Sequence, residues 1–238
     1  MADRDQWTYD EMKHVGTDYE SAAEVDDYDR RMSRVRDIPA EIEEALAALG
    51  LSAGQRLIEF GTGTGELAIT ASERCREVIA ADISAAMLER ARQKAAGRGR
   101  ANIRFLRAGL LGYRHEGEPA DAAVTQIALH HLPDFWKQIA LVNINRALRP
   151  GGRLFVRDLV FSMKLEKYDT AIDRMLERFR EAGGDGMADK VANHIKSEYS
   201  TFDWVIEEML YRAGFDIVSA DYGDYFLAAY LCTKTREA

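Results

Sequence analysis

Short apolar runs alternate with amphipathic stretches through the middle of the chain. Five of these runs have the length and apolar content of buried strands, and they cover residues 55–60, 77–82, 102–109, 121–129 and 153–161. Between them, apolar residues recur at helical spacing in 84–96 and 134–149, and a further helix is predicted after Gly65. This repeated alternation predicts a parallel sheet with helices on both faces.

Residues that typically start and stop helices mark several boundaries. The stretch 38–50 has Pro39 near its start and Gly50 past its end, which is the usual punctuation of a helix. Ser84 is a suitable N-cap for the helix 84–96. The sequence Pro150-Gly151-Gly152 is predicted to end the helix 134–149.

The alternation breaks after residue 161. Apolar residues at helical spacing predict a helix over 164–180 that Gly183-Gly184 ends, and a second helical piece follows up to Ile195. A further helix is expected over 200–215, capped by Ser200 or Thr201. Two β-rich segments then flank Gly223-Asp224, which predicts an antiparallel hairpin.

The predicted fold class is therefore α/β: a doubly wound Rossmann-like sheet, mostly parallel with a C-terminal antiparallel hairpin, plus helical N-terminal and inserted cap segments. We expect a single domain with three parts: an N-terminal cap segment 1–37, a core of 38–160 and 200–235, and a helical insertion or lid over 161–199. Aromatic residues are dense in the N-terminal segment, so we expect that segment to pack on the core.

Composition narrows the class of protein. The 238 residues are 47% apolar and carry a net charge of −8, which disfavours binding to nucleic acid or to anionic membranes. The N-terminus lacks an apolar signal region and no apolar run is long enough to span a membrane, so we expect a cytoplasmic protein. Cys75 and Cys232 lack metal-type spacing, so we expect reduced thiols and no metal.

The stretch LIEFGTGTGE (57–66) follows a strand and carries glycines at alternate positions, which is typical of a nucleotide-binding turn. A dinucleotide fingerprint would need a glycine where Glu66 stands, and a phosphate-binding P-loop would need a lysine that is absent. Glu59 would repel a pyrophosphate but attract an amino group. Asp82 ends the next strand and can accept two hydrogen bonds from a ribose diol. These residues suit an adenosyl sulfonium with an amino acid tail.

Three stretches resemble the motifs of class I S-adenosylmethionine-dependent methyltransferases: LIEFGTGTGELAI, VIAADISAAMLERAR and DAAVTQIALHHLPDFWKQIALVNINRALRPGGRLFVRD. The resemblance covers residues 40–160 closely and 200–233 by architecture. The LHHLPD stretch is most similar to small-molecule methyltransferases related to the quinone-biosynthesis group. The cofactor implied is S-adenosyl-L-methionine, with S-adenosyl-L-homocysteine as its product.

The resemblance implies these cofactor-binding residues: Glu59, Gly61, Thr62, Gly63, Gly65, Asp82, Ile83, Gly109, Leu110, Gln126, Ile127, Tyr28 and Arg31. In this family a backbone carbonyl at the end of the fourth strand holds the methionine amino group, and an N-terminal aromatic and basic residue clamp the carboxylate. The chain departs from the pattern at Gly109, where the family often has an acid that binds the adenine amino group. Backbone atoms of Gly109 and Leu110 are expected to serve instead.

His130, His131 and Asp158 are the candidate catalytic residues, because His titrates near neutral pH and Asp158 ends the fifth strand at the pocket mouth. The alternative is that one histidine caps the strand end and the other is exposed. His194, Glu198 and Tyr199 in the insertion are weaker candidates.

The function expected is methyl transfer to a small-molecule acceptor by in-line displacement, in which the protein mainly aligns the reacting groups and excludes water. Residues 125–128 read TQIA, so the motif that methylates amino groups of nucleic-acid bases is absent. The amphipathic helix 164–180 would cover the pocket or form a homodimer interface. The alternatives are a non-catalytic module that binds S-adenosylmethionine, an NAD-dependent oxidoreductase, and an enzyme that uses the same cofactor for another reaction.

Overall fold

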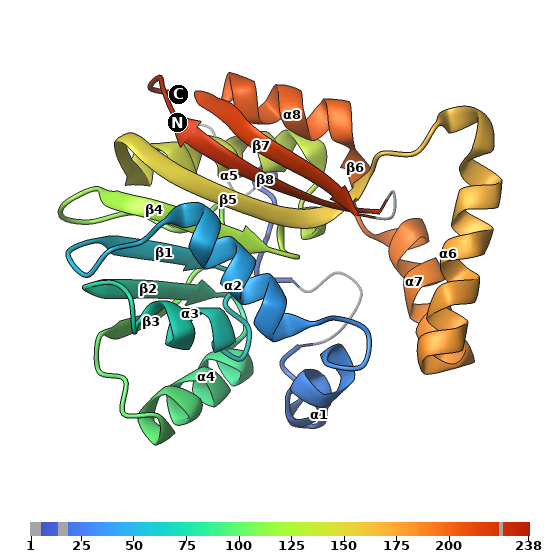
Figure 1. Cartoon of the computed structure of the whole chain (residues 1–238), viewed down its shortest axis with the longest axis horizontal. Coiled ribbons are helices and arrows are strands. Elements are labelled where there is room, and N and C mark those ends of the chain that lie inside the picture. The colour runs from blue at the N-terminus through green and yellow to red at the C-terminus, as the bar shows by residue number, and fades with distance from the viewer. Residues whose placement is uncertain (1–5, 14–18, 224–225) are drawn as a thin grey trace.

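A computed structural model describes residues 6–13, 19–223 and 226–238. Within these ranges, eight strands form one sheet (Figure 1). They are β1 (Arg56–Phe60), β2 (Glu77–Asp82), β3 (Ile103–Arg107), β4 (Ala120–Gln126), β5 (Leu148–Phe161), β6 (Thr201–Phe202), β7 (Phe215–Gly223) and β8 (Leu227–Lys234). The order is β3-β2-β1-β4-β5-β8-β7, with β6 beside β5. Pairing is parallel except for β5 with β8 and β7 with β8, which confirms the predicted fold class.

The helices of the described chain are α1 (Ala22–Met32), α2 (Ile38–Leu49), α3 (Glu66–Ala71), α4 (Ala85–Gly97), α5 (Asp134–Ala147), α6 (Tyr168–Gly183), α7 (Asp185–Ser197) and α8 (Asp203–Arg212). Short 3-10 turns at Leu129–His131 and Leu165–Lys167 precede α5 and α6. The helix α2 has the predicted Pro near its start and Gly50 at its end, and the Asp37 side chain caps it by accepting from the Ala40 N–H.

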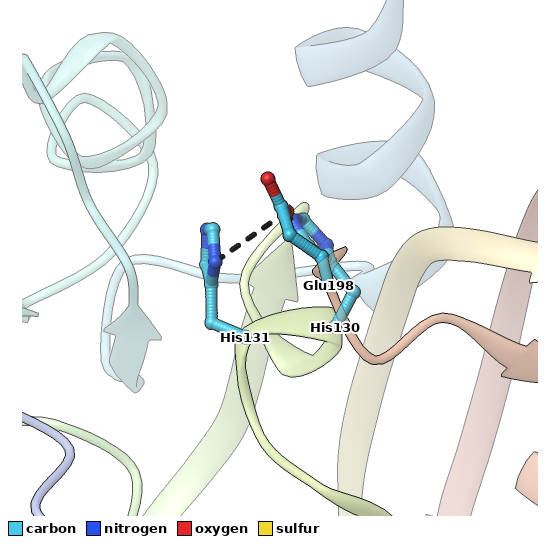
Figure 2. Close-up of side chains that lie close together, drawn as sticks. All are labelled: His130, His131 and Glu198. Atoms are coloured by element: carbon cyan, nitrogen blue, oxygen red, sulfur yellow. Dashed lines mark ion pairs between the residues drawn. The ribbon is translucent and has the colours of Figure 1, made fainter. Parts of the chain in front are cut away.

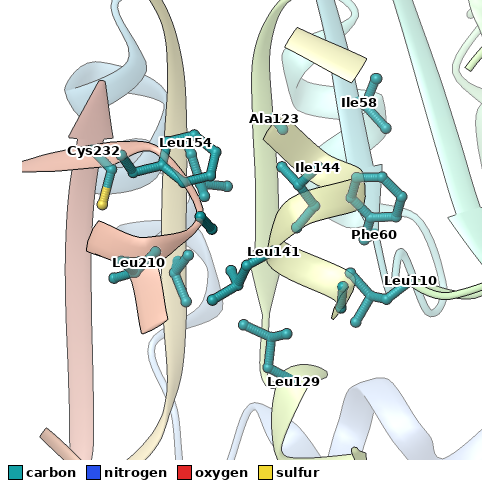
Figure 3. Packing of buried hydrophobic residues seen from close by; sticks show 14 of the residues in the cluster. Ile58, Phe60, Leu110, Ala123, Leu129, Leu141, Ile144, Leu154, Leu210 and Cys232 are labelled. Carbon is teal, nitrogen blue, oxygen red and sulfur yellow. The ribbon is translucent and has the colours of Figure 1, made fainter. Parts of the chain in front are cut away.

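Two apolar cores flank the sheet because successive side chains of a strand point to opposite faces. One core contains Ile58 and Phe60 of β1, Leu141 and Ile144 of α5, and Leu210 of α8 (Figure 3). Leu57 lies on the other face, in the core that α2 and α3 cover. Both cores are closed by fully buried residues, so the sheet is a rigid base for the loops at its edges.

Two predicted helix boundaries are wrong. The helix α5 ends at Ala147, before the predicted Pro150-Gly151-Gly152, because Leu148 already pairs with Ala120 and β5 runs through the Pro-Gly-Gly turn. The helix α8 begins at Asp203 and lacks the predicted Ser or Thr cap. Thr201 forms strand β6 instead, through parallel pairing with Val160.

The inserted segment forms a helical pair that stands beside the sheet at the edge where the parallel strands end (Figure 1). The helix α6 begins at Tyr168, after the 3-10 turn, and the predicted Gly183-Gly184 ends it. Among the described side chains of α6 and α7, only Met175 and Ala188 are buried. The pair therefore contributes little to the two cores of the sheet.

The described part of the N-terminal segment packs on the domain, as predicted. The Trp7 ring stacks on Trp136 of α5 at 6.2 Å between centroids, and Tyr9 packs against the same ring. The Tyr9 hydroxyl donates to the carbonyl of His131 over 3.2 Å. Residues 6–13 are thereby held against the end of β4 and the start of α5.

The end of β7 lies close to the start of β8 in the C-terminal hairpin, since the N–H of Phe226 donates to the carbonyl of Gly223. The predicted turn residue Asp224 lies outside the described residues. Within the described ranges, no helix has both the length and the apolar character needed to cross a bilayer.

Candidate active site

The glycine turn between β1 and α3 approaches the end of β4 closely. Gly61 has φ +74°, and a Cβ on it would lie 2.7 Å from the Cβ of Ala128. Gly65 has φ +83°, and a Cβ there would lie 2.8 Å from the Cβ of Ala91 in α4. Glycine is therefore required by both the backbone conformation and the space at these two positions.

Asp82, at the end of β2, fixes the turn and the start of α4 together. One carboxylate oxygen accepts from the Gly63 N–H over 2.7 Å, and the other accepts from the Ser84 N–H over 2.9 Å. A carboxylate is a suitable acceptor for the hydroxyl groups of a diol. The side chain of Ser84 caps α4, as predicted.

Glu59 lies below the turn and is 5% exposed. The Thr62 hydroxyl donates to its carboxyl over 2.7 Å. Burial raises the pKa of Glu59 to about 8, and this outweighs the hydrogen bond from Thr62. The carboxyl group is mostly protonated at neutral pH, and a cation placed near it would favour its ionised form.

Two adjoining cavities lie beyond the carboxyl ends of the parallel strands, where α/β sheets bind ligands. The first contains about 1030 Å³ of space, its open mouth included, which is enough for a nucleoside. They share these lining residues: Tyr28, Met32, Arg36, Gly61, Gly63 and Gln126. The glycine turn therefore separates two ends of one trough.

The two ends of the trough differ in chemistry. Asp82, Ile83, Gly109 and Leu110 line the first cavity, with Met87 of α4 beside them. Glu59 and Thr62 line the second cavity, together with acidic and polar residues of α1 and α2. Most of the predicted cofactor residues are thus brought together. The apolar residues and Asp82 lie at one end of the trough, and Glu59 lies at the other. Their contact with a cofactor stays a prediction.

The predicted N-terminal clamp is only partly assembled. Tyr28 lines both cavities, and burial raises the pKa of its hydroxyl. Arg31 lies over the Tyr28 ring at 5.9 Å and lines neither cavity. Arg36 lines both and is paired with Glu41. Arg36 is a basic residue that the sequence pattern missed, because it follows α1 outside any motif.

The end of β4 reaches the trough in a strained conformation. Gln126, Ile127 and Ala128 line the first cavity. Ile127 has φ +52°, which is rare for a β-branched residue and costs of order 1–3 kcal/mol. Its N–H donates to the carbonyl of Arg157 over 2.7 Å, which holds the distorted backbone. Such strain is typical of functional sites.

A cluster of histidines and carboxylates reaches this end of the trough through His131, and Figure 2 shows three of its members, His130, His131 and Glu198. His130 is buried, with Nδ1 2.6 Å from an Asp158 oxygen and Nε2 3.3 Å from Glu198. The Nδ1 atom of His131 lies 3.6 Å from the same Glu198 carboxylate. His194 of α7 also contacts Glu198, over 2.7 Å. The weaker sequence candidates His194 and Glu198 therefore belong to the cluster of the stronger ones.

The charges in this cluster differ sharply between the two adjacent histidines. Burial alone would lower the pKa of His130, but the Asp158 and Glu198 carboxylates raise it to about 9. Burial and the charge of His130 lower the pKa of His131 to about 3. His130 is therefore a cation at neutral pH, and His131 is neutral.

The three predicted catalytic residues have different places. His131 lines the first cavity, whereas His130 and Asp158 lie behind it and line neither cavity. The His130, His131 and Glu198 ligand atoms lie within 4.8 Å of one another, so these residues could hold a metal ion. The predicted absence of a metal stays a prediction.

The known proteins that this chain resembles in sequence are methyltransferases. The sequence profile of a methyltransferase domain family matches residues 57–152. An uncharacterized methyltransferase of Geobacillus kaustophilus is 31% identical over 195 residues, which are 80% of this chain and 85% of that protein. A ubiquinone/menaquinone biosynthesis C-methyltransferase of Pectobacterium carotovorum is 30% identical over 185 residues, 71% of this chain and 70% of its own.

A solved structure has the same fold. The crystal structure of a SAM dependent methyltransferase from Aquifex aeolicus matches with a TM-score of 0.62 and 16% identity, and the match covers 90% of this chain and 98% of the other. At this identity the likeness concerns the fold alone.

Proposed function

Because the chain belongs to the class I S-adenosylmethionine-dependent methyltransferases, we propose that it transfers a methyl group from S-adenosylmethionine to a small-molecule acceptor. Two carboxyl groups on either side of the glycine turn support this function most directly. Asp82 lies where a ribose diol would be bound, and the buried Glu59 lies where an ammonium group would be bound.

The residues present fit this cofactor. The close approach of Gly61 to Ala128 leaves bare backbone at the centre of the trough, against which a ligand can lie. Ile83, Met87 and Leu110 offer an apolar surface to a purine at one end. When bound, the cofactor supplies a methyl group on a positively charged sulfur. The protein has then to hold the acceptor in line and exclude water.

His131 is the member of the histidine cluster that faces the acceptor in this proposal. Its ring lines the first cavity and is neutral at neutral pH, so one nitrogen can accept a hydrogen bond from a hydroxyl or amino group. His130 and Asp158 act as positioning residues, since they lie behind it. A His131→Ala variant is expected to lower turnover about tenfold or more and to change the affinity for S-adenosylhomocysteine less than about threefold.

Two observations favour a small organic acceptor over a nucleic acid. The net charge of −8 disfavours binding to the phosphates of a nucleic acid. Aromatic side chains from the N-terminal segment, Tyr9, Tyr19 and Tyr28, line the cavity beside His131. Such rings suit a flat or apolar molecule. The quinone-pathway name of one relative points in the same direction.

Calorimetric titration with S-adenosylmethionine, S-adenosylhomocysteine and NADH tests the cofactor. Micromolar binding of the adenosyl ligands that an Asp82→Ala variant weakens at least tenfold would support the proposal. Binding of NADH in their place would overturn it. Binding without methyl transfer to any member of a panel of phenols, quinols and amines would favour the non-catalytic alternative.

A further inference from the structure

We propose that Glu11, from the N-terminal segment, is the acid that accepts the adenine amino group and takes the place of the acid absent at Gly109. This inference rests on the proposed function, because it assigns a residue to one end of the same ligand. It also makes residues 6–13 a part of the cofactor site.

Glu11 is held firmly at the adenine end of the trough. Its side chain lines the first cavity together with Ile83 and Leu110. One carboxylate oxygen accepts from the Leu111 N–H over 2.8 Å, across 100 positions of sequence, and the other accepts from the Gly112 N–H. The carboxylate therefore lies against the loop that follows β3, where the family's acid usually stands.

The space beside Gly109 is occupied by the Glu11 side chain, and the backbone at Gly109 does not itself require a glycine. Its φ lies outside the left-handed region that favours glycine. A Cβ on Gly109 would overlap Oε2 and Cδ of the Glu11 side chain in its present position. The Glu11 carboxyl group thus fills the space that a side chain at position 109 would fill. A side chain at position 109 would therefore displace the Glu11 carboxyl group from the place that it occupies.

The carboxylate keeps acceptor capacity for a ligand. It offers about four lone-pair positions, of which the two backbone N–H groups use two. Burial raises the pKa of Glu11, and the hydrogen bonds from Leu111 and Gly112 oppose that rise. An amino donor from a purine would add a further hydrogen bond to the ionised form. The edge of adenine that carries an amino group is complementary to this acceptor, whereas a carbonyl at the same place would repel it.

The segment that carries Glu11 is also anchored just before it. Tyr9 donates to the carbonyl of His131 and packs on Trp136, so the chain crosses the cavity before it reaches Glu11. The same segment therefore contacts the acceptor side through Tyr9 and the adenine side through Glu11.

Four variants test the assignment: Glu11→Gln, Glu11→Ala, Gly109→Asp and the double variant Glu11→Ala with Gly109→Asp. Each is titrated calorimetrically with S-adenosylhomocysteine and with S-inosylhomocysteine, in which a carbonyl replaces the amino group. We expect the wild-type protein to prefer the adenine ligand by about tenfold or more, since a hydrogen bond to a charged group contributes about 1.5–3 kcal/mol. The preference should fall at least fivefold in Glu11→Gln, whose amide can donate to the carbonyl.

The double variant gives the decisive comparison. Glu11→Ala should lose the preference, and the carboxylate that Gly109→Asp adds to it should restore the preference by filling the vacated space. Gly109→Asp alone should bind weakly, because its side chain meets Glu11. Melting temperatures establish that each variant is folded, and Glu208→Gln is the matched control, the same change at an exposed residue of α8.

The outcomes separate the two proposals. A wild-type protein that prefers the adenine ligand, together with an unchanged preference in folded Glu11→Gln and Glu11→Ala, would overturn the role of Glu11 and leave the proposed function standing. A wild-type protein that binds neither ligand would overturn both.

Discussion

At the scale of single residues, Glu59 combines deep burial with a position beside the glycine turn. A carboxyl group with a pKa of about 8 keeps its proton at neutral pH, so the ligand-free protein avoids an unpaired buried charge. A ligand ammonium group would stabilise the carboxylate and lower that pKa. Ligand binding and proton release are therefore coupled.

This coupling predicts that about one proton leaves the protein when S-adenosylhomocysteine binds at pH 7. The affinity should rise with pH up to about 8, because the proton that must leave is lost from the free protein there. Calorimetry at pH 7 in buffers of different ionisation enthalpy measures the number of protons. Glu59→Gln should release none from this position, and an unchanged release in that variant would contradict the coupling.

Local motifs predicted some of the site residues and could not predict others. Gly61, Gly63 and Asp82 stand within one strand–turn–helix unit and the strand that follows it, so their spacing in the sequence largely fixes their spacing in the fold. Glu11 reaches the site from 100 positions away, through contacts that no spacing records. Arg36 likewise enters the trough from the connection between α1 and α2.

At the scale of elements, the cluster around His130 fastens the end of α7 to the start of α5. The Tyr199 N–H donates to the His130 carbonyl, and Lys137 of α5 donates to the Tyr199 carbonyl. Glu198 lies between His130 and His194. The ion pairs of a positive His130 with Asp158 and Glu198 add to these hydrogen bonds.

Protonated His130 should stabilise the fold in a pH-dependent way. Its pKa is about 9 in the fold against about 6.5 when unfolded, so the stabilisation is complete below pH 6.5 and is lost as the pH rises through 9. Glu198→Gln should cost roughly 3 kcal/mol at pH 7, and clearly less at pH 10. Denaturant unfolding at several pH values measures this difference.

The control for Glu198 is Glu208→Gln, which breaks an exposed i,i+4 pair with Arg212. That change should cost less than about 0.5 kcal/mol at any pH, because water screens an exposed pair. Equal costs for both variants, or a Glu198→Gln cost that does not fall toward pH 10, would show that the His130 cation is not the stabilising group.

Element type followed from the hydrophobic pattern more reliably than element ends did. The alternation of strands and helices is recorded in local periodicity, and the five predicted strands from residue 55 to 161 follow one another along the chain as β1 to β5. The end of α5 was predicted wrongly, because Leu148 pairs with Ala120 and β5 therefore begins before the Pro-Gly-Gly turn. The start of α8 was missed for the same reason, since β6 pairs with a strand about forty residues earlier.

At the scale of the whole molecule, the topology gathers the site at one edge of the sheet and leaves the caps to close it. The carboxyl ends of β1, β2 and β4 meet there, and the N-terminal segment lies across them. The amphipathic stripe of 164–180 predicted a helix but not its partner, because periodicity shows only that a face is apolar. In the structure, none of the residues lining the two described cavities comes from α6 or α7.

This arrangement predicts opposite effects for removing the two caps. Replacement of residues 165–197 by a short Gly-Ser linker should leave the affinity for S-adenosylhomocysteine within about threefold of the wild type. The linker can close the gap because Phe161 and Phe202 are paired in adjacent strands, and the replaced part adds only Met175 and Ala188 to the buried residues. Removal of residues 1–13, by contrast, should weaken the same binding at least tenfold through loss of Glu11.

Measurement of methyl transfer by the linker variant then tests whether α6 and α7 act as a lid over the acceptor. If α6 and α7 close over the acceptor, the linker variant binds the adenosyl ligand normally but loses turnover, since the reacting groups are no longer shielded from water. Turnover equal to that of the wild type would instead favour a role of the pair in contacts between copies of the chain. Sedimentation of the wild type and of the linker variant would detect such contacts. Loss of folding in the linker variant would contradict the separation of the pair from the core, because neither of the two described cores contains a residue of α6 or α7.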